Sequence, residues 1–169
     1  MQSLYDMYEY LSDKIDLSWG IVMKVMVNTG TSIIQAFYEK KGSTLKDEYR
    51  QSAAVAFMDL KDMQKLSLKS RDKIKIKSEW GEVVLYADIS YDAPHEGMVF
   101  IPRGPWANII ISPETYCCNV PTYKGIPAEI YKTDEDVLLV SQLMNKVYNK
   151  YNLDNEQLGD KPTYKKRLI

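Results

Sequence analysis

The sequence predicts a mainly β protein: a small β-barrel with short helices and with helical appendages at both ends. Several short apolar segments are bounded by turn residues, which is typical of strands. A single short helical pattern interrupts them, so the regular alternation of strand and helix that builds a parallel α/β sheet is missing. The chain has 169 residues, of which 45% are hydrophobic and 27% charged, as expected for one globular domain.

The first segment, residues 1–22, has apolar side chains at helical spacing. They stand at positions 4, 7, 8, 11 and 15, where they line one face of a helix. The pattern stops before Trp19 and Gly20. We expect a helical extension that packs on its own domain or on a partner.

Strand patterns begin after this segment. We expect strands over residues 24–28 and 53–57, and then a short helix from Leu60 with Asp59 as its N-cap. This pattern places Leu60, Met63 and Leu66 on one side of the helix.

The clearest local signal is a β-hairpin. Lysine and isoleucine alternate strictly from Lys73 to Lys77, residues 78–81 form the turn, and residues 82–89 return. Alternating lysines are typical of a solvent-exposed face rather than of a nucleic-acid groove. Another apolar strand follows over residues 97–102.

The last part of the chain predicts one more helix and a tail. Thr133 begins a pattern like a capping box, with the acidic Asp136 three residues later. Apolar side chains at positions 137, 140, 144, 147, 148 and 151 then indicate a helix. Residues 152–169 are polar and contain a basic run near the end, so we expect an extended tail.

Charge and apolar runs exclude several classes of protein. The 22 Lys and Arg residues nearly balance the 23 Asp and Glu residues, which argues against a nucleic-acid-binding protein. No apolar run approaches the roughly 20 residues that cross a bilayer, so we expect no membrane insertion. The start of the chain lacks a signal-peptide pattern, which favours a cytoplasmic protein.

Cysteine and histidine are too few for most catalytic or metal sites. Cys117 and Cys118 are adjacent, which provides no disulfide framework, and His95 is the only histidine. A closed structural zinc site and a Ser-His-Asp unit are therefore not expected. His95 lies in a turn before a strand, where a structural role is the simpler interpretation. We predict neither catalytic residues nor metal ligands in this chain.

Three stretches together resemble a known family. The first ends in Asn28-Thr29-Gly30-Thr31-Ser32, the second spans residues 59–83, and the third runs from Gly97 through Asn108 to residues 121–130. Their order and spacing resemble the molybdopterin-dinucleotide-binding domain of the DMSO-reductase superfamily, a double-psi β-barrel. Within that group the chain is similar to a family of free-standing subunits of formylmethanofuran dehydrogenase, the tungsten or molybdenum enzyme of methanogenic archaea.

The resemblance implies a domain division and a function. Residues 1–22 are then an N-terminal extension, residues 23–131 the molybdopterin-dinucleotide-binding double-psi barrel, and residues 132–169 a C-terminal helix and tail. It implies a non-catalytic subunit of an oxidoreductase complex that reduces carbon dioxide to formate and transfers the formyl group to methanofuran. The cofactor implied is bis(molybdopterin guanine dinucleotide) with tungsten or molybdenum, shared with a catalytic subunit, and iron–sulfur clusters are confined to partner subunits.

The expected cofactor-binding residues combine the family pattern with the chemistry of the ligand. An asparagine amide offers both a donor and an acceptor, as the edge of a pterin requires. Glycine-containing turns let backbone amides approach phosphate oxygens, and arginine or lysine offsets phosphate charge. The candidate residues are Asn28, Thr29, Gly30, Thr31, Ser32, Arg103, Gly104, Trp106, Asn108, Pro121 and Lys124.

Two departures from the family pattern and two alternative functions accompany this prediction. Arg71 stands in place of the glycine of the family's Gly-Asp turn and would be strained at positive φ, so we expect this turn to differ locally. Asn119 stands near a position where the family has a small residue, and asparagine tolerates left-handed backbone there. A double-psi barrel also occurs as an adaptor module of AAA ATPases, without a cofactor. The same barrel forms a self-cleaving pyruvoyl decarboxylase, for which Gly42-Ser43 is the only candidate bond.

Partner contacts are expected from the helix over residues 4–15, the helix after Thr133 and the tail.

Overall fold

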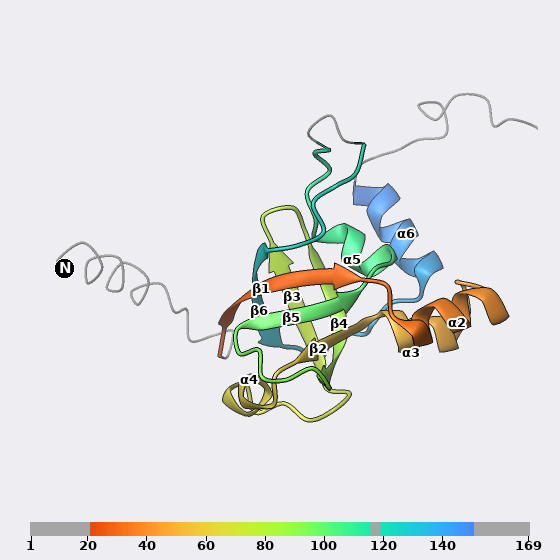
Figure 1. The fold of residues 1–169 in the computed structure, drawn as a ribbon. Coiled ribbons are helices and arrows are strands. Elements are labelled where there is room, and N and C mark those ends of the chain that lie inside the picture. Colours follow the sequence, from red (N-terminus) through yellow and green to blue (C-terminus); the bar gives the residue numbers. More distant parts are fainter. Residues whose placement is uncertain (1–20, 116–118, 151–169) are drawn as a thin grey trace, which may run out of the picture.

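The computed structural model describes residues 21–115 and 119–150, and the strands in these ranges close into a barrel (Figure 1). The strands are β1 (Met23–Gly30), β2 (Val55–Met58), β3 (Lys73–Ser78), β4 (Glu82–Ile89), β5 (Met98–Pro102) and β6 (Ile126–Lys132). The helices are α2 (Ile33–Lys41), α3 (Asp47–Ala53), α4 (Leu60–Lys65), α5 (Pro105–Ile109) and α6 (Val140–Lys150). The expected helix over residues 4–15, the two cysteines and the tail over residues 152–169 lie outside the described residues.

The strands follow the order β1-β5-β2-β4-β3-β6, and β6 pairs back to β1. The β1–β5 and β2–β4 pairs are parallel, whereas the remaining pairs are antiparallel. Exchanging β1 with β4, β2 with β5 and β3 with β6 leaves every pair and its direction unchanged. The barrel is therefore made of two interlocked halves, each ordered strand, strand, helix, strand, with α2 and α3 inserted in the first. The expected double-psi barrel is confirmed.

The predicted hairpin is present, and its apolar side chains fill the core. Lys73 pairs with Tyr86 and Lys77 with Glu82, so residues 78–81 form the turn as expected. β-Branched side chains pack well on a pleated surface. The largest fully buried side chains include Ile74, Ile76, Leu85, Ile101 and Ile130.

The lysines of β3 do not all face solvent, which corrects the expectation from their alternation. Lys75 is only 9% exposed, and its ammonium group pairs with Glu135 and lies 3.9 Å from Glu82. Lys73 pairs with Asp136 at 2.6 Å. Burial is the largest single effect and lowers the pKa of Lys75, but the hydrogen bond to Glu135 and the nearby negative charges together outweigh it, so the pKa lies above its usual value. An acidic segment from far along the chain therefore covers this part of the sheet.

Helix α4 begins as the sequence predicts, and its two buried aspartates also hold a distant loop. Asp59 caps the helix by accepting from the backbone N–H of Lys61 at 2.9 Å. Its second oxygen accepts from the N–H of His95 at 2.9 Å, and Asp62 accepts from the N–H of Gly97 at 2.6 Å. The loop between β4 and β5 is thus fixed to α4, and the structural interpretation of His95 agrees with its place there.

The charge on Asp59 is expected to make this anchor sensitive to acid. Hydrogen bonds from the N–H groups of His95 and Lys61 hold the pKa of Asp59 below its ordinary value of 3.8. A lowered pKa contributes stability above the unfolded-state value, and that contribution is lost as pH falls through the folded-state value. Asp59→Asn should therefore lower the urea midpoint at about pH 6, and the difference from wild type should vanish at about pH 2. Asp92→Asn, in an exposed loop, is the matched control and should leave the midpoint unchanged at both values.

Two element boundaries differ from the sequence prediction. β2 begins at Val55, because Ala53 still belongs to α3. The last helix begins at Val140 rather than directly after Thr133. The Thr133 hydroxyl accepts from the N–H of Glu135 in a turn, and the acids of this turn pair with lysines of β3. The cap of α6 comes instead from Gln142, whose side-chain oxygen accepts from the N–H of Leu139 at 2.9 Å.

Arg71 and Asn119 both adopt left-handed backbone. Arg71 has φ 71° and Asn119 has φ 59°. Asparagine tolerates this region, and arginine at such a position is unusual for a non-glycine residue. The turn before β3 therefore takes left-handed backbone at Arg71 despite its large side chain, although we expected strain there to change the turn.

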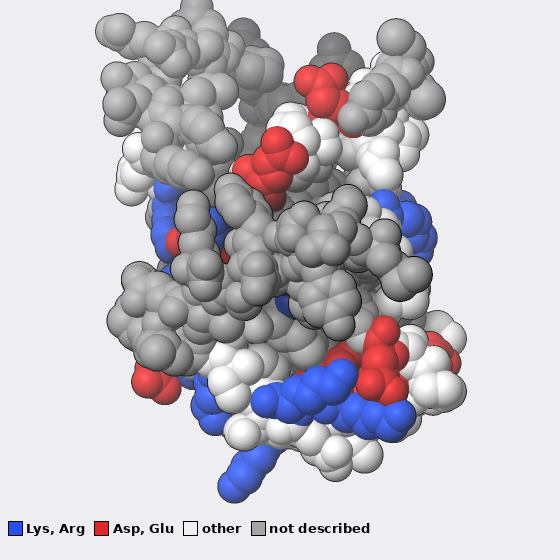
Figure 2. Space-filling view, turned by 90° about the vertical axis from the view of Figure 1, so that its left-hand side faces the viewer, with Lys and Arg blue, Asp and Glu red and all other residues white. Residues whose placement is uncertain are grey.

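The described surface mixes both signs of charge. Toward the lower end of the face in Figure 2, basic and acidic side chains stand next to one another. On α4, which lies at the lower end of Figure 1, Lys61 and Lys65 both pair with Glu96. Within residues 21–115 and 119–150, no helix is long and apolar enough to cross a membrane.

Candidate functional site

The parallel pairing of β1 and β5 brings two turns to the same end of the barrel. Gly30 aligns with Pro102, so the two strands end side by side (Figure 1). The backbone N–H of Arg103 donates to the carbonyl of Gly30 at 2.7 Å. Residues 28–32 and 103–104 are therefore neighbours, although they are far apart in the sequence.

A third segment lies alongside the end of β1. The carbonyl of Tyr123 accepts from the N–H of Thr29 at 2.8 Å, and the N–H of Gly125 donates to the Asn28 side-chain oxygen at 2.9 Å. Both bonds fix this segment against the strand. We call the three joined segments the rim: residues 28–32, 103–104 and 121–125.

The rim combines positive charge with open backbone. The Arg103 guanidinium lies 4.2 Å from the centre of the Tyr123 ring, a cation–π contact that orients it. A Cβ atom added at Gly30 would come 3.0 Å from the Phe100 ring and 3.7 Å from the Lys124 ammonium. Because glycine has no such atom, the Lys124 ammonium can approach a ligand over the backbone there.

Helix α2 begins directly at the rim. Ser32 is its N-cap and accepts from the N–H of Gln35 at 3.1 Å, and the two residues form a capping box. Thr31, just before the cap, is exposed. The amino end of a helix carries partial positive charge, which adds to that of Arg103. The rim therefore has the electrostatics of an anion-binding site.

Two of the predicted binding residues have buried side chains. Thr29 is 0% exposed, and its hydroxyl has no partner among the described residues. Trp106 is also 0% exposed, and its indole N–H donates to the carbonyl of Leu138 at 3.0 Å. In this structure Trp106 packs α5 against the core and the segment before α6. A contact between either side chain and a ligand stays a prediction.

The remaining predicted residues lie at the surface around the rim. Asn108 is exposed on α5, one helical turn after Gly104, whose carbonyl accepts from the Asn108 N–H at 3.0 Å. Its side chain makes no hydrogen bond to another residue of the described ranges. Pro121 is half-buried and Lys124 exposed. The structure thus joins residues 28–32, Arg103 and the segment around Lys124 by direct contacts, and places Asn108 on α5 without such a contact.

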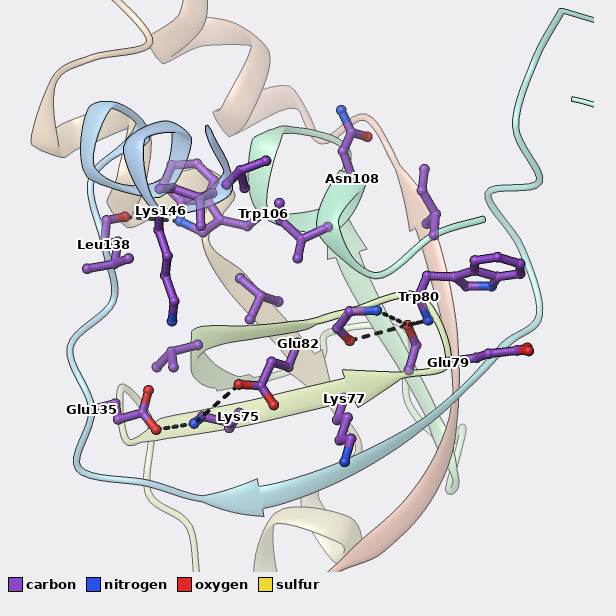
Figure 3. A pocket seen from close by; sticks show the side chains of 18 of the residues that line it. Lys75, Lys77, Glu79, Trp80, Glu82, Trp106, Asn108, Glu135, Leu138 and Lys146 are labelled. Atoms are coloured by element: carbon purple, nitrogen blue, oxygen red, sulfur yellow. Dashed lines mark hydrogen bonds and ion pairs between the residues drawn. The ribbon is translucent and has the colours of Figure 1, made fainter. Parts of the chain in front are cut away.

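A cavity of about 810 Å³ lies between the β3–β4 hairpin, α5 and α6 (Figure 3). Lys75, Glu82 and Glu135 form an ion-pair network within it, and Lys146 extends into it from α6. Asn108 lies at its edge. Because Glu82 and Glu135 both pair with Lys75, neither carboxylate is free to act as a general base.

Two residues that shape the rim were missed from the sequence. Tyr123 stacks against Arg103, and Gln35 donates from its side-chain nitrogen to the Arg103 carbonyl. The spacing of Ser32 and Gln35 is that of a capping box, which could have revealed the start of α2. Nothing in the sequence pattern points to the contact between Gln35 and Arg103, because it joins distant segments.

Metal ligands are not gathered in the described part of the chain. Within residues 21–115 and 119–150, no group of three or more His, Cys, Asp or Glu side chains is placed to hold a metal ion.

Residues 27–127 match the family described as "Molydopterin dinucleotide binding domain". The matched range contains the whole rim and part or all of each of the six strands. The chain belongs to this molybdopterin dinucleotide-binding family. The resemblance stated from the sequence is thereby confirmed.

Two proteins of known name are similar to this chain. Protein FwdD of Methanocaldococcus jannaschii is 43% identical over 129 residues, which cover 75% of this chain and 96% of the relative. A subunit of the molybdenum-containing formylmethanofuran dehydrogenase 1 of Methanothermobacter thermautotrophicus is 31% identical over 119 residues. That match covers 70% of this chain and 29% of the relative, so this chain corresponds to one part of that longer protein.

Solved structures resemble the chain more distantly. Acetylene hydratase from Pelobacter acetylenicus aligns with a TM-score of 0.46 and 19% identity, over 74% of this chain and 20% of the enzyme.

Proposed function

We propose that this chain is the non-catalytic subunit of a formylmethanofuran dehydrogenase that binds molybdopterin guanine dinucleotide together with a catalytic subunit. The observation that carries the proposal is the rim, in a member of the molybdopterin dinucleotide-binding family that is 43% identical to FwdD. Three segments converge there and present arginine, lysine and the start of a helix to an anion.

The groups on the rim fit the chemistry of a dinucleotide. Arg103 provides a forked donor for a pyrophosphate, and Lys124 adds a second positive charge beside the open backbone of Gly30. Asn108, exposed and unpaired among the described residues, supplies a donor and an acceptor for a heterocyclic edge. These residues would hold and orient the cofactor.

The division of labour follows from the residues present. The bound metal–pterin centre, with tungsten or molybdenum, supplies the redox chemistry of carbon dioxide reduction, and the protein supplies binding and orientation. Arg103 and Lys124 neutralise phosphate charge, and the rim backbone fixes where the dinucleotide lies. Iron–sulfur clusters and the metal's protein ligand belong, in this proposal, to partner subunits.

An exposed apolar face next to the rim supports a partner that covers the cofactor. On α2, Ile33 is 89%, Ile34 63% and Phe37 54% exposed. Contiguous exposed apolar side chains mark interaction sites. Because Ser32, the N-cap of α2, belongs to the rim, a catalytic subunit that encloses a dinucleotide on the rim reaches this face. The expected contacts from the outer face of α6 stay a prediction, since Leu143 on its inner face packs against this chain's own core.

Replacing Phe37 with glutamine is expected to weaken assembly with the catalytic subunit. The side chain is more than half exposed, so the fold should persist, whereas loss of a buried interface aromatic raises a dissociation constant about tenfold or more. Affinity is measured by titrating the two purified subunits. Leu60→Gln, an exposed apolar residue on α4 at the other end of the barrel, is the control and should bind as wild type. Equal affinities for all three proteins would exclude α2 from the interface.

The function itself is tested on the native protein. The purified assembly should have a native mass above that of a 19.5 kDa chain and should release pterin and guanine nucleotide on denaturation. A monomer that releases neither would refute the proposal. Recovery of an ATPase in place of iron–sulfur subunits would support the adaptor alternative, and a cleaved chain at Gly42-Ser43 the decarboxylase alternative.

A further inference from the structure

Helix α2 buries a polar side chain and exposes apolar ones. Its only buried residue is Gln35, at 3% exposure, whereas Ile33 and Ile34 on the same helix face solvent. A buried amide without hydrogen-bond partners costs free energy, so its position needs an explanation in bonds rather than in packing.

Both ends of the Gln35 amide are used, and they bond to different segments of the rim. The side-chain oxygen accepts from the N–H of Ser32 at 3.4 Å. The side-chain nitrogen donates to the carbonyl of Arg103. The N–H of Arg103 is bonded to Gly30, so both backbone polar groups of Arg103 are held, one by β1 and one by α2.

We infer that Gln35 is a positioning residue that joins the two phosphate-facing turns of the rim, residues 28–32 and 103–104, and thereby sets the direction of the Arg103 guanidinium. Gln35 itself is buried and does not touch the ligand. The inference rests on the proposed function, because the ligand that Arg103 faces is the dinucleotide of that proposal.

Glutamine and glutamate at position 35 differ in whether they can join the two turns. Either residue completes a capping box, and a glutamate also suits the positive end of a helix. A carboxylate, however, has no hydrogen to donate to the Arg103 carbonyl. Gln35→Glu therefore keeps the cap of α2 and removes the bond between the two turns.

The chain contains a matched control for this substitution. Gln142 stands at the same third position of α6, and its oxygen likewise accepts from the N–H of the residue before the helix. Its nitrogen has no partner among the described residues. Gln142→Glu thus makes the same chemical change without breaking a contact between segments.

The first measurement is hydrogen exchange in the full chain. In Gln35→Glu the protection of the Arg103 amide should fall about tenfold at pH 7, since local opening no longer breaks the second bond to that residue. Gln142→Glu should match wild type. Should Gln35→Glu fail to fold, Gln35→Leu removes the donor without adding charge and should show the same fall. Unchanged Arg103 protection in a folded variant would overturn the inference.

The second measurement is cofactor retention by the purified native complex. Gln35→Glu should lose guanine nucleotide about tenfold faster than wild type at pH 7. Acidification toward pH 5 should slow this loss, because a protonated carboxyl can donate to the Arg103 carbonyl as the amide does. A defect of structure alone would not recover on acidification.

The outcomes separate this inference from the proposed function. Reduced Arg103 protection with normal nucleotide retention would overturn the positioning role and leave the proposed function standing. A wild-type complex without pterin or nucleotide would overturn both, and the exchange data would still show whether Gln35 joins the two turns.

Discussion

Replacing Gly30 with aspartate is expected to remove the guanine nucleotide from the native complex. The new Cβ would lie 3.7 Å from the Lys124 ammonium, so the carboxylate takes the place of a phosphate beside it. Like charges brought together at an interface cost several kcal/mol, which lowers affinity on the order of 100-fold. The measurement is nucleotide released per complex after gel filtration and denaturation.

The control for this substitution is Gly42→Asp. A Cβ there would lie 3.4 Å from the Lys46 ammonium, so the new carboxylate also meets a lysine, in the loop between α2 and α3. Gly42→Asp should retain nucleotide as wild type does. Normal nucleotide content in Gly30→Asp would show that no phosphate lies at Gly30.

Replacing Arg103 with alanine is expected to have the second largest effect. Hydrogen bonds to charged groups contribute about 1.5–3 kcal/mol, so nucleotide affinity should fall about 10- to 150-fold. Arg103→Lys keeps the charge but loses the forked geometry and the stacking on Tyr123, and should lie between wild type and alanine. The loss should be measured by equilibrium exchange of nucleotide at two salt concentrations.

Arg71→Lys is the control for Arg103→Lys. The Arg71 guanidinium lies 5.3 Å from the Tyr86 ring, so the same kind of stacking is changed on another pair of residues. Nucleotide affinity should not change in this control. An Arg103→Ala complex with wild-type nucleotide affinity would mean that Arg103 does not bind the nucleotide.

Local patterns predicted those parts of the fold that depend on neighbours in sequence. The hairpin follows from the alternation after Lys73, and the start of α4 follows from Asp59. The double-psi order of the strands was predicted from the resemblance, because strand order depends on contacts that no local pattern encodes. The burial of Lys75 was missed for the same reason, since Glu135 covers it from a distant segment.

The candidate site was predicted in part. The backbone bonds of Gly30 with Arg103 and of Thr29 with Tyr123 bring several of the candidate residues together, and ligand binding by them stays a prediction. Trp106 was expected beside the ligand, and its contact with a ligand stays a prediction, because the indole is buried where α5 packs into the core. Gln35 was missed, because its function depends on a hydrogen bond to Arg103 across the rim.

An experimental structure of the native complex tests most directly whether the rim binds the dinucleotide. We expect phosphate oxygens of the cofactor within hydrogen-bond distance of Arg103 and Lys124, beside the start of α2. A cofactor held wholly by other subunits, with the rim covered by protein side chains, would contradict it.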